Sequence, residues 1–218
     1  LNLIKINRLT KKIFKIVVAL ALVFVAVYLA LNATATYRSA KFSLDPQSFK
    51  DDKLLEAVEA IADQHNFSPT QGQVIENNLP DNWLSYPRFG IKAPIFWDVP
   101  TEIATEKLAD GLVHIANTSK PGDGGESLIS GHSSYYWWQK GNYKEVFVNL
   151  PKAEIGDKVI IRRDSTYIYS VTNKYQVGGG EGLTFETAGE EKLSLMTCVP
   201  LGTNLRRLIV EAKLESSF

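Results

Sequence analysis

The chain has 218 residues, of which 44% are hydrophobic and 11% aromatic, and its 24 basic side chains balance its 24 acidic ones. This is enough material for one well-packed domain with an appendage. The formal net charge of zero, with no Lys and Arg run interleaved with aromatic residues in the body of the chain, gives no support for a nucleic acid as partner. Nucleic-acid binding is therefore set aside.

The N-terminal part departs from this charge balance. Residues 1–44 contain no Asp or Glu, and several Lys and Arg residues precede the apolar stretch 16–31. At a helical rise of about 1.5 Å per residue this stretch nearly spans a bilayer, and residues 32–35 extend it into the interface. The basic excess predicts a cytoplasmic tail over residues 1–15 and a transmembrane anchor over 16–35, with the rest of the chain outside the cell.

The apolar stretch has two alternative interpretations besides a single-pass membrane anchor. A cleaved secretory signal is supported by the small-x-small site Ala33-Thr34-Ala35, but the apolar run is longer than the roughly 7–15 residues of a signal core. A buried core helix is disfavoured because no polar face interrupts the run. Both the membrane anchor and the cleaved signal put the globular part outside the cytoplasm.

After the anchor, apolar side chains at helical spacing predict an amphipathic helix near residues 51–65. His65 lies just past its last turn and is read as a solvated end residue. Residues 69–87 are rich in Asn, Gln, Gly and Pro and indicate a connector. Residues 36–83 are therefore interpreted as an extracytoplasmic linker, which either covers a cleft as a lid or spaces the following domain from the bilayer.

Short β-type segments separated by turn residues make up the remainder, and brief helical pieces fit near 102–109 and 144–150. Many strands with no room for regular crossover helices predict a mainly β fold, a closed antiparallel-rich barrel over residues 84–218. The segments are 85–99, 127–132, 158–163, 167–177, 192–198 and 205–214.

Cys198 is the only cysteine of the chain and ends the apolar run LSLMTC. Outside the cell it is an intermolecular disulfide partner, an inert core residue or a reactive thiol. A nucleophilic thiolate needs an adjacent imidazole or another positive group. His132 follows an apolar strand and opens a polar loop, whereas His114 has apolar neighbours and looks structural. Arg206 and Arg207 are adjacent on a predicted strand, so only one of them can face the sulfur.

These residues, taken in order, resemble those of the sortases, the membrane-anchored cysteine transpeptidases of mainly Gram-positive bacterial surfaces. Residues 111–132 resemble the family's pattern of a Gly and His, Pro-Gly and Gly-Gly before the catalytic Gly-His. Residues 193–198 resemble its Leu-x-Thr-Cys strand end, and 204–210 supply the Arg of the next strand. Met196 departs from the β-branched or small residue that the family often has there. The resemblance covers residues 84–214.

The resemblance implies a sortase-like barrel and a transpeptidase mechanism. Cys198 would attack the carbonyl between Thr and Gly of a Leu-Pro-x-Thr-Gly sorting signal to form a thioacyl intermediate. His132 would act as acid and base, and Arg207, preferred over Arg206, would stabilise the oxyanion. Thr197 and His114 are implied near the substrate cleft, although Thr197 could equally be strand filling.

The implied partners are surface proteins that carry such a signal, and an amine acceptor from a peptidoglycan precursor or a pilin. No step requires a metal or a cofactor. Two other functions stay open, a catalytically silent membrane-tethered β-barrel binding module with a buried thiol and a hydrolytic cysteine peptidase. The aromatic run 135–138 is either a core plug or an exposed patch, and partial burial is favoured because four exposed aromatic side chains invite aggregation.

Overall fold

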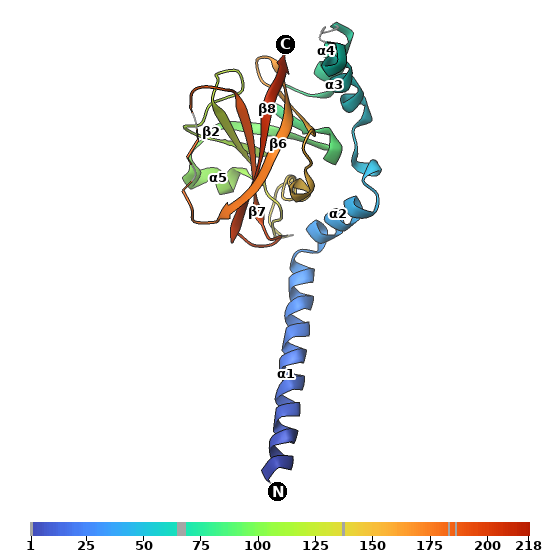
Figure 1. The fold of residues 1–218 in the computed structure, drawn as a ribbon, viewed down its shortest axis with the longest axis vertical. Coiled ribbons are helices and arrows are strands. Elements are labelled where there is room, and N and C mark those ends of the chain that lie inside the picture. Colours follow the sequence, from blue (N-terminus) through green and yellow to red (C-terminus); the bar gives the residue numbers. More distant parts are fainter. Residues whose placement is uncertain (1, 65–68, 137, 183, 186) are drawn as a thin grey trace.

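The computed structural model describes residues 2–64, 69–136, 138–182, 184–185 and 187–218. A long helix, α1 (Asn2–Leu31), projects from one end of a β-barrel, and the C-terminus lies at the other end (Figure 1). Within α1, Thr10–Leu31 has a mean hydropathy of 2.7 and is not buried by the rest of the protein. Its length and composition are compatible with a membrane anchor, and a signal sequence has the same character.

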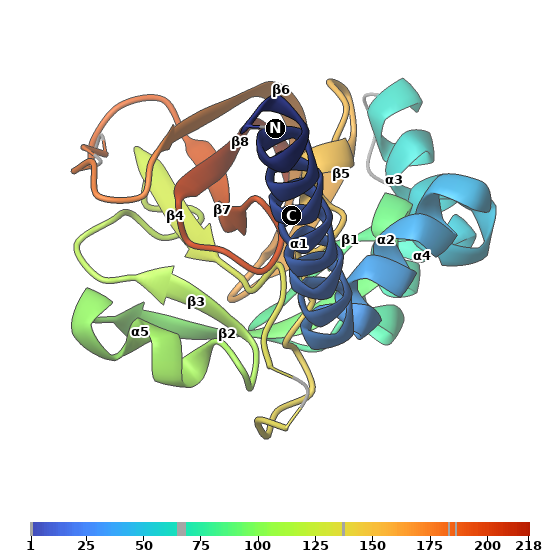
Figure 2. The same cartoon turned by 90° about the horizontal axis from the view of Figure 1, so that it is seen from below.

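A helical strap, residues 33–78, follows α1 and runs along one side of the barrel (Figures 1 and 2). Phe42 enters the barrel core beside Tyr86 and Phe89. Apolar residues further along the strap bury themselves against Ile160 and Ile168. The strap consists of α2 (Ala33–Leu44), the 3₁₀ turn η1 (Gln47–Phe49), α3 (Asp52–Gln64) and α4 (Pro69–Asn78).

The amphipathic helix predicted near 51–65 is confirmed as α3, and His65 lies outside the described residues. The connector predicted over 69–87 is wrong in its first half, because α4 occupies residues 69–78. Ile75 and Leu79 are fully buried, so tertiary packing overrides the polar composition of this segment.

Eight strands close into one barrel in the order β1-β2-β3-β4-β7-β8-β6-β5. Neighbouring strands are antiparallel except for the pairs β2/β3 and β4/β7, which confirms the predicted closed, antiparallel-rich architecture. The strands are β1 (Trp83–Tyr86), β2 (Ile91–Val99), β3 (Leu112–Ile115), β4 (Glu126–Ser130), β5 (Lys158–Arg162), β6 (Thr166–Gly178), β7 (Lys192–Val199) and β8 (Arg206–Ser217).

Local details differ from the sequence-based expectation in three places. The segment predicted as 85–99 holds two strands, which the 3₁₀ turn η2 (Pro87–Phe89) separates. The strand β3 was not predicted, because all four of its residues are buried and show no alternation. The helical piece near 102–109 is confirmed as α5 (Thr101–Lys107). Residues 144–149, by contrast, form turns that lead into η3 (Leu150–Lys152).

Candidate active site

Cys198 and Arg207 lie directly opposite each other on the antiparallel strands β7 and β8. On these strands Leu195, Val199 and Leu208 point into the barrel core. Cys198 and Arg207 occupy the alternate positions, so both side chains belong to the outer face. The thiol is free and partly exposed. Arg206, in contrast, is paired with Val199 and faces the other way.

His132 reaches the same place from β4. The parallel register of β4 and β7 pairs Ser130 with Met196, and the Gly131 N–H donates to the Met196 carbonyl at 3.0 Å. His132 lies two residues beyond Ser130, where β4 ends, and Cys198 lies two residues beyond Met196, so an extension of the parallel register puts the two residues at the same level. The Thr197 hydroxyl donates to the Gly131 carbonyl at 2.7 Å and so fixes the two strand ends together.

Gly131 is required by packing and not by an unusual backbone angle. A Cβ at this position would lie 2.5 Å from a ring carbon of Phe147 and 2.8 Å from a methyl carbon of Leu112. No larger side chain fits between β4 and these two core residues without displacing them. The Gly of the Gly-His pair therefore lets the His132 backbone come close to the barrel wall.

The His132 ring is buried, with 9% of the residue exposed. It stacks on Tyr135 with ring centroids 4.6 Å apart and an interplanar angle of 17°. Its Nε2 has no hydrogen-bond partner among the residues that the structure describes. Burial lowers the pKa of His132 to about 4, because the charged imidazolium is poorly solvated there. At neutral pH the ring is therefore neutral and its Nε2 is available.

The loop from Pro200 to Leu205 joins the two strands that carry Cys198 and Arg207. Its Gly202 N–H donates to the Ser134 hydroxyl at 3.0 Å, which ties it to the segment after His132. Its Asn204 carbonyl accepts a bond from the Arg207 guanidinium at 3.1 Å. The sequence did not identify Ser134 or Asn204, since neither residue type is distinctive; the Ser134 contact joins distant segments, and the Asn204 contact is made by a backbone carbonyl, which any residue supplies.

His114 and Thr197, the two predicted substrate-binding residues, are both buried. His114 lies on β3 and is paired with Ile129 of β4. Its ring nitrogens contact the Asp98 backbone N–H, the Thr118 hydroxyl and the Ser119 carbonyl. Both side chains thus make contacts within the fold, and their part in substrate binding stays a prediction.

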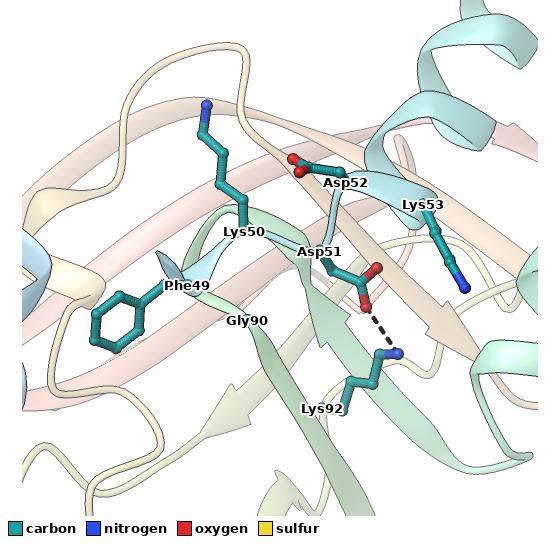
Figure 3. Close-up of a pocket in the computed structure, with 7 residues that line it drawn as sticks. All are labelled: Phe49, Lys50, Asp51, Asp52, Lys53, Gly90 and Lys92. Carbon is teal, nitrogen blue, oxygen red and sulfur yellow. Dashed lines mark ion pairs between the residues drawn. The ribbon is translucent and has the colours of Figure 1, made fainter. Parts of the chain in front are cut away.

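A hollow of about 510 Å³ lies elsewhere, where the strap meets η2 and β2. Figure 3 shows its lining, in which Lys92 pairs with Asp51 at 2.8 Å. None of the predicted site residues lines it, so it is not the candidate active site. In the part of the chain that the structure describes, no cluster of three or more His, Cys, Asp or Glu residues is arranged to hold a metal ion.

A family model described as "Sortase domain" matches residues 84–215, and among curated proteins none matches. Solved structures with the same fold include sortase C1 from Streptococcus agalactiae, which has a TM-score of 0.52 and 21% identity, with 87% of this chain and 90% of that chain covered. Sortase C1 from Streptococcus suis has a TM-score of 0.53 and 19% identity over 75% of this chain and 95% of that one.

A mutant of sortase E from Streptomyces avermitilis is 26% identical, with a TM-score of 0.50 over 64% of this chain and 90% of that chain. The family match spans the barrel and includes the segments that bear His132, Cys198 and Arg207. The barrel topology agrees with these solved sortases. With more than half of its length matched by the family model, the chain belongs to the sortase family, a family of transpeptidases.

Proposed function

We propose that this sortase is a cysteine transpeptidase that cuts a Leu-Pro-x-Thr-Gly-type sorting signal between Thr and Gly and transfers the upstream protein to an amine. The observation that carries the proposal is the shared outer face of Cys198 and Arg207, with His132 brought level by the β4/β7 register. These three side chains supply a nucleophile, a proton carrier and a fixed positive charge, which are the groups that acyl transfer needs.

In the first half of the reaction His132, which is neutral at rest, takes the proton of the Cys198 thiol. The thiolate attacks the Thr carbonyl carbon, and the carbonyl oxygen becomes an oxyanion. When the C–N bond breaks, the His132 imidazolium gives its proton to the departing Gly amine. A thioester between Cys198 and the Thr carbonyl remains, with His132 neutral again.

In the second half an acceptor amine attacks the thioester. His132 removes a proton from the attacking nitrogen, the C–S bond breaks, and Cys198 leaves as the thiolate. The new amide joins the surface protein to the acceptor, either a peptidoglycan precursor or a pilin. The proton on His132 then returns to the thiolate and closes the cycle.

Arg207 stabilises the oxyanion of both tetrahedral intermediates. Its guanidinium stays charged at all relevant pH values and offers five donors. One donor goes to the Asn204 carbonyl, which orients the head group on the Cys198 side of the sheet. For Thr197 we propose a positioning role, because its hydroxyl bonds to the Gly131 carbonyl. For His114, whose ring bonds to the 118–119 turn, we propose a structural role at the wall of the cleft.

The division of the chain follows from this proposal. Residues 84–218 are the catalytic barrel, 36–83 the extracytoplasmic linker, 16–35 the anchor and 1–15 a cytoplasmic tail. In the described part of the linker, buried contacts with β5 and β6 favour a fixed strap over a lid. β5 lies across the closed strand order from β4 and β7, and Ile168 of β6 is level with Ser216, at the end of β8 opposite to Arg207.

Mass spectrometry of the purified chain tests the reaction. The protein is incubated with a Leu-Pro-x-Thr-Gly peptide, with and without triglycine. We expect an acyl adduct that maps to Cys198 and that hydroxylamine removes, and amide-linked product that increases with triglycine. The Cys198→Ala variant is the control. Product that is only the free acid would indicate a peptidase. A thiol that neither forms an adduct nor reacts with a charged alkylating reagent before denaturation would indicate a silent binding module.

A further inference from the structure

The loop after His132, which we call the aromatic loop (residues 133–145), is held at both of its ends close to the C-terminal end of α1. At one end Ser134 accepts the Gly202 N–H, and the neighbouring Leu201 carbonyl accepts the Tyr28 hydroxyl of α1 at 2.7 Å. At the other end Glu145 accepts a hydrogen bond from Thr34 and lies 4.0 Å from the Arg38 guanidinium. The aromatic loop is thus a neighbour of the last turn of α1 and the first turns of α2.

The contact between α1 and the active-site loop is close. Gly202 has a φ of +75°, and a Cβ there would lie 2.4 Å from the Asn32 side-chain oxygen. Any other residue would meet both a strained backbone angle and this side chain. The loop that joins Cys198 to Arg207 is therefore fitted directly against the end of α1.

The aromatic loop presents ring surface to solvent, which differs from the partial burial predicted for this run. Tyr136 and Trp138 are 50% and 51% exposed, and their rings stack 4.7 Å apart at 12°. Trp137 lies outside the described residues, and Tyr135 is the half-buried partner of His132. Lys140 follows with its side chain exposed. Tyr and Trp with nearby Lys are the residues enriched at membrane–water interfaces.

The length of α1 indicates where a bilayer surface would cross the helix. The apolar part of α1, Thr10–Leu31, has 22 residues, and at about 1.5 Å per residue it is close to the thickness of a hydrocarbon core. The interface then falls near residue 31, beside Tyr28, Asn32 and Thr34. Figure 1 shows this end of α1 meeting the base of the barrel, and Figure 2 views the same base from the α1 side.

A small hollow beside the end of α1 is lined by polar and charged side chains. It measures about 250 Å³ and lies between the start of α2 and the end of the aromatic loop. Its lining mixes cationic, hydroxyl, amide and carboxylate groups from Thr34, Arg38, Asn142, Lys144 and Glu145.

We infer that the aromatic loop inserts its Tyr136 and Trp138 rings into the lipid interface beside α1. This inference rests on the proposed anchoring role of α1 and adds a second membrane contact, made by the barrel itself. The barrel does not swing freely on the anchor but touches the bilayer through the aromatic loop, which follows His132 and is tied to the loop between Cys198 and Arg207. The lipid surface is the partner because the exposed rings belong to a loop whose two ends are bonded to Gly202, which packs against Asn32, and to Thr34, both beside the end of α1.

Spin labels test this in the full chain. In a Cys198→Ala background, which removes the only thiol, single cysteines are introduced as Tyr136→Cys, Trp138→Cys, Phe24→Cys and Ser217→Cys and labelled with a nitroxide. Phe24 is 73% exposed on α1, and Ser217 ends β8 next to the C-terminus, at the far end of the barrel (Figure 1). The labelled proteins are reconstituted into vesicles of equal parts phosphatidylcholine and phosphatidylglycerol.

Power saturation then compares collisions with oxygen, which concentrates in lipid, and with a water-soluble nickel chelate. We expect the oxygen-to-nickel ratio at positions 24, 136 and 138 to be several-fold higher than at 217. A lipid-like ratio at 24 with water-like ratios at both 136 and 138 would overturn the loop contact and leave the anchor intact. A water-like ratio at 24 would overturn the anchor and this inference together. Neither outcome depends on transpeptidase activity, so the proposed reaction is judged separately.

Discussion

Two regions of the barrel each hold a buried histidine, and their surroundings are opposite. Around His114, Nδ1 accepts the Asp98 backbone N–H at 3.3 Å, and Nε2 lies 2.9 Å from the Ser119 carbonyl and 3.0 Å from the Thr118 hydroxyl. Around His132, Nε2 has no partner among the described residues. Burial lowers the pKa of both rings, so the difference lies in hydrogen bonding and not in charge.

This contrast separates a structural histidine from one that can move a proton. The His114 ring is fixed as the tautomer with its proton on Nε2, and adding a second proton would break the bond at Nδ1. The Asp98 carboxylate lies 3.5 Å from that nitrogen, but desolvation of the ring outweighs it and the pKa stays lowered. Within the described part of the chain nothing bonds to Nε2 of His132, so a proton can arrive there and leave without breaking a hydrogen bond of the fold.

Replacing each ring by alanine gives the largest expected difference. His132→Ala should lower kcat/KM for peptide transfer by about 10²–10⁴-fold, the usual contribution of a positioned acid–base group, with little change in the thermal midpoint. His114→Ala should lose about 1–3 kcal/mol of stability, since it orphans buried partners, while the folded fraction transfers peptide at nearly the original rate. Steady-state kinetics and thermal unfolding measure both. A raised KM at unchanged stability in His114→Ala would instead support substrate binding by that ring.

The two adjacent arginines test whether the face of β8 that carries Cys198's partner decides the catalytic effect. Arg207→Ala should reduce kcat by about 10²–10³-fold, the cost of losing one oxyanion donor, because Arg207 shares the Cys198 face. Arg206→Ala is the matched control. It removes the same charge from the next position, which is exposed, and should change kcat by no more than a few-fold. Equal losses in the two variants would show that the effect is one of net charge and not of position.

The lowered pKa of His132 also predicts a pH dependence of stability. The unfolded chain protonates this ring below about pH 6.5, whereas the folded chain keeps it neutral down to about 4. Unfolding therefore takes up a proton between these values, and the stabilising contribution is complete above about 6.5 and decreases as the pH falls towards 4. The full difference corresponds to about 3 kcal/mol. Denaturant unfolding of the original chain and of His132→Ala, measured across this window, should give similar stabilities above about pH 6.5 and diverge as the pH falls, because only the original chain loses this contribution. Parallel curves would contradict a neutral buried ring.

The Cys198 and Arg207 end of the site could be predicted from the sequence because it is local. The two residues flank one short loop, and strand alternation alone limits the sulfur to one of two neighbouring arginines. The approach of His132 could not be derived in this way. It depends on the parallel pairing of β4 with β7, which links distant segments and leaves no local pattern. The sequence made His132 a candidate because it stands where an apolar strand opens into a polar loop, and the family resemblance implied its role as acid and base.

Other features were missed for identifiable physical reasons. β3 is too short and too uniformly buried to show a period of two. The polar composition of α4 indicated a connector, but its few apolar residues are buried against the barrel. The exposure of Tyr136 and Trp138 opposed a rule for soluble surfaces. Under the proposed membrane contact that rule does not apply, because exposed aromatic rings at a bilayer surface have lipid as their solvent.

The smallest expected effect concerns the bond that joins the two site strands. Thr197→Val keeps the shape of the side chain and removes the hydroxyl that donates to the Gly131 carbonyl at 2.7 Å. We expect a loss of about 1 kcal/mol in stability, together with a lower kcat at unchanged KM, because His132 directly follows Gly131 and loses its fixed distance to the nucleophile strand. Thr197→Ser, which retains the hydroxyl, should restore kcat. A raised KM in Thr197→Val with normal kcat would make Thr197 a substrate contact and would place the control of His132 in the Tyr135 stack.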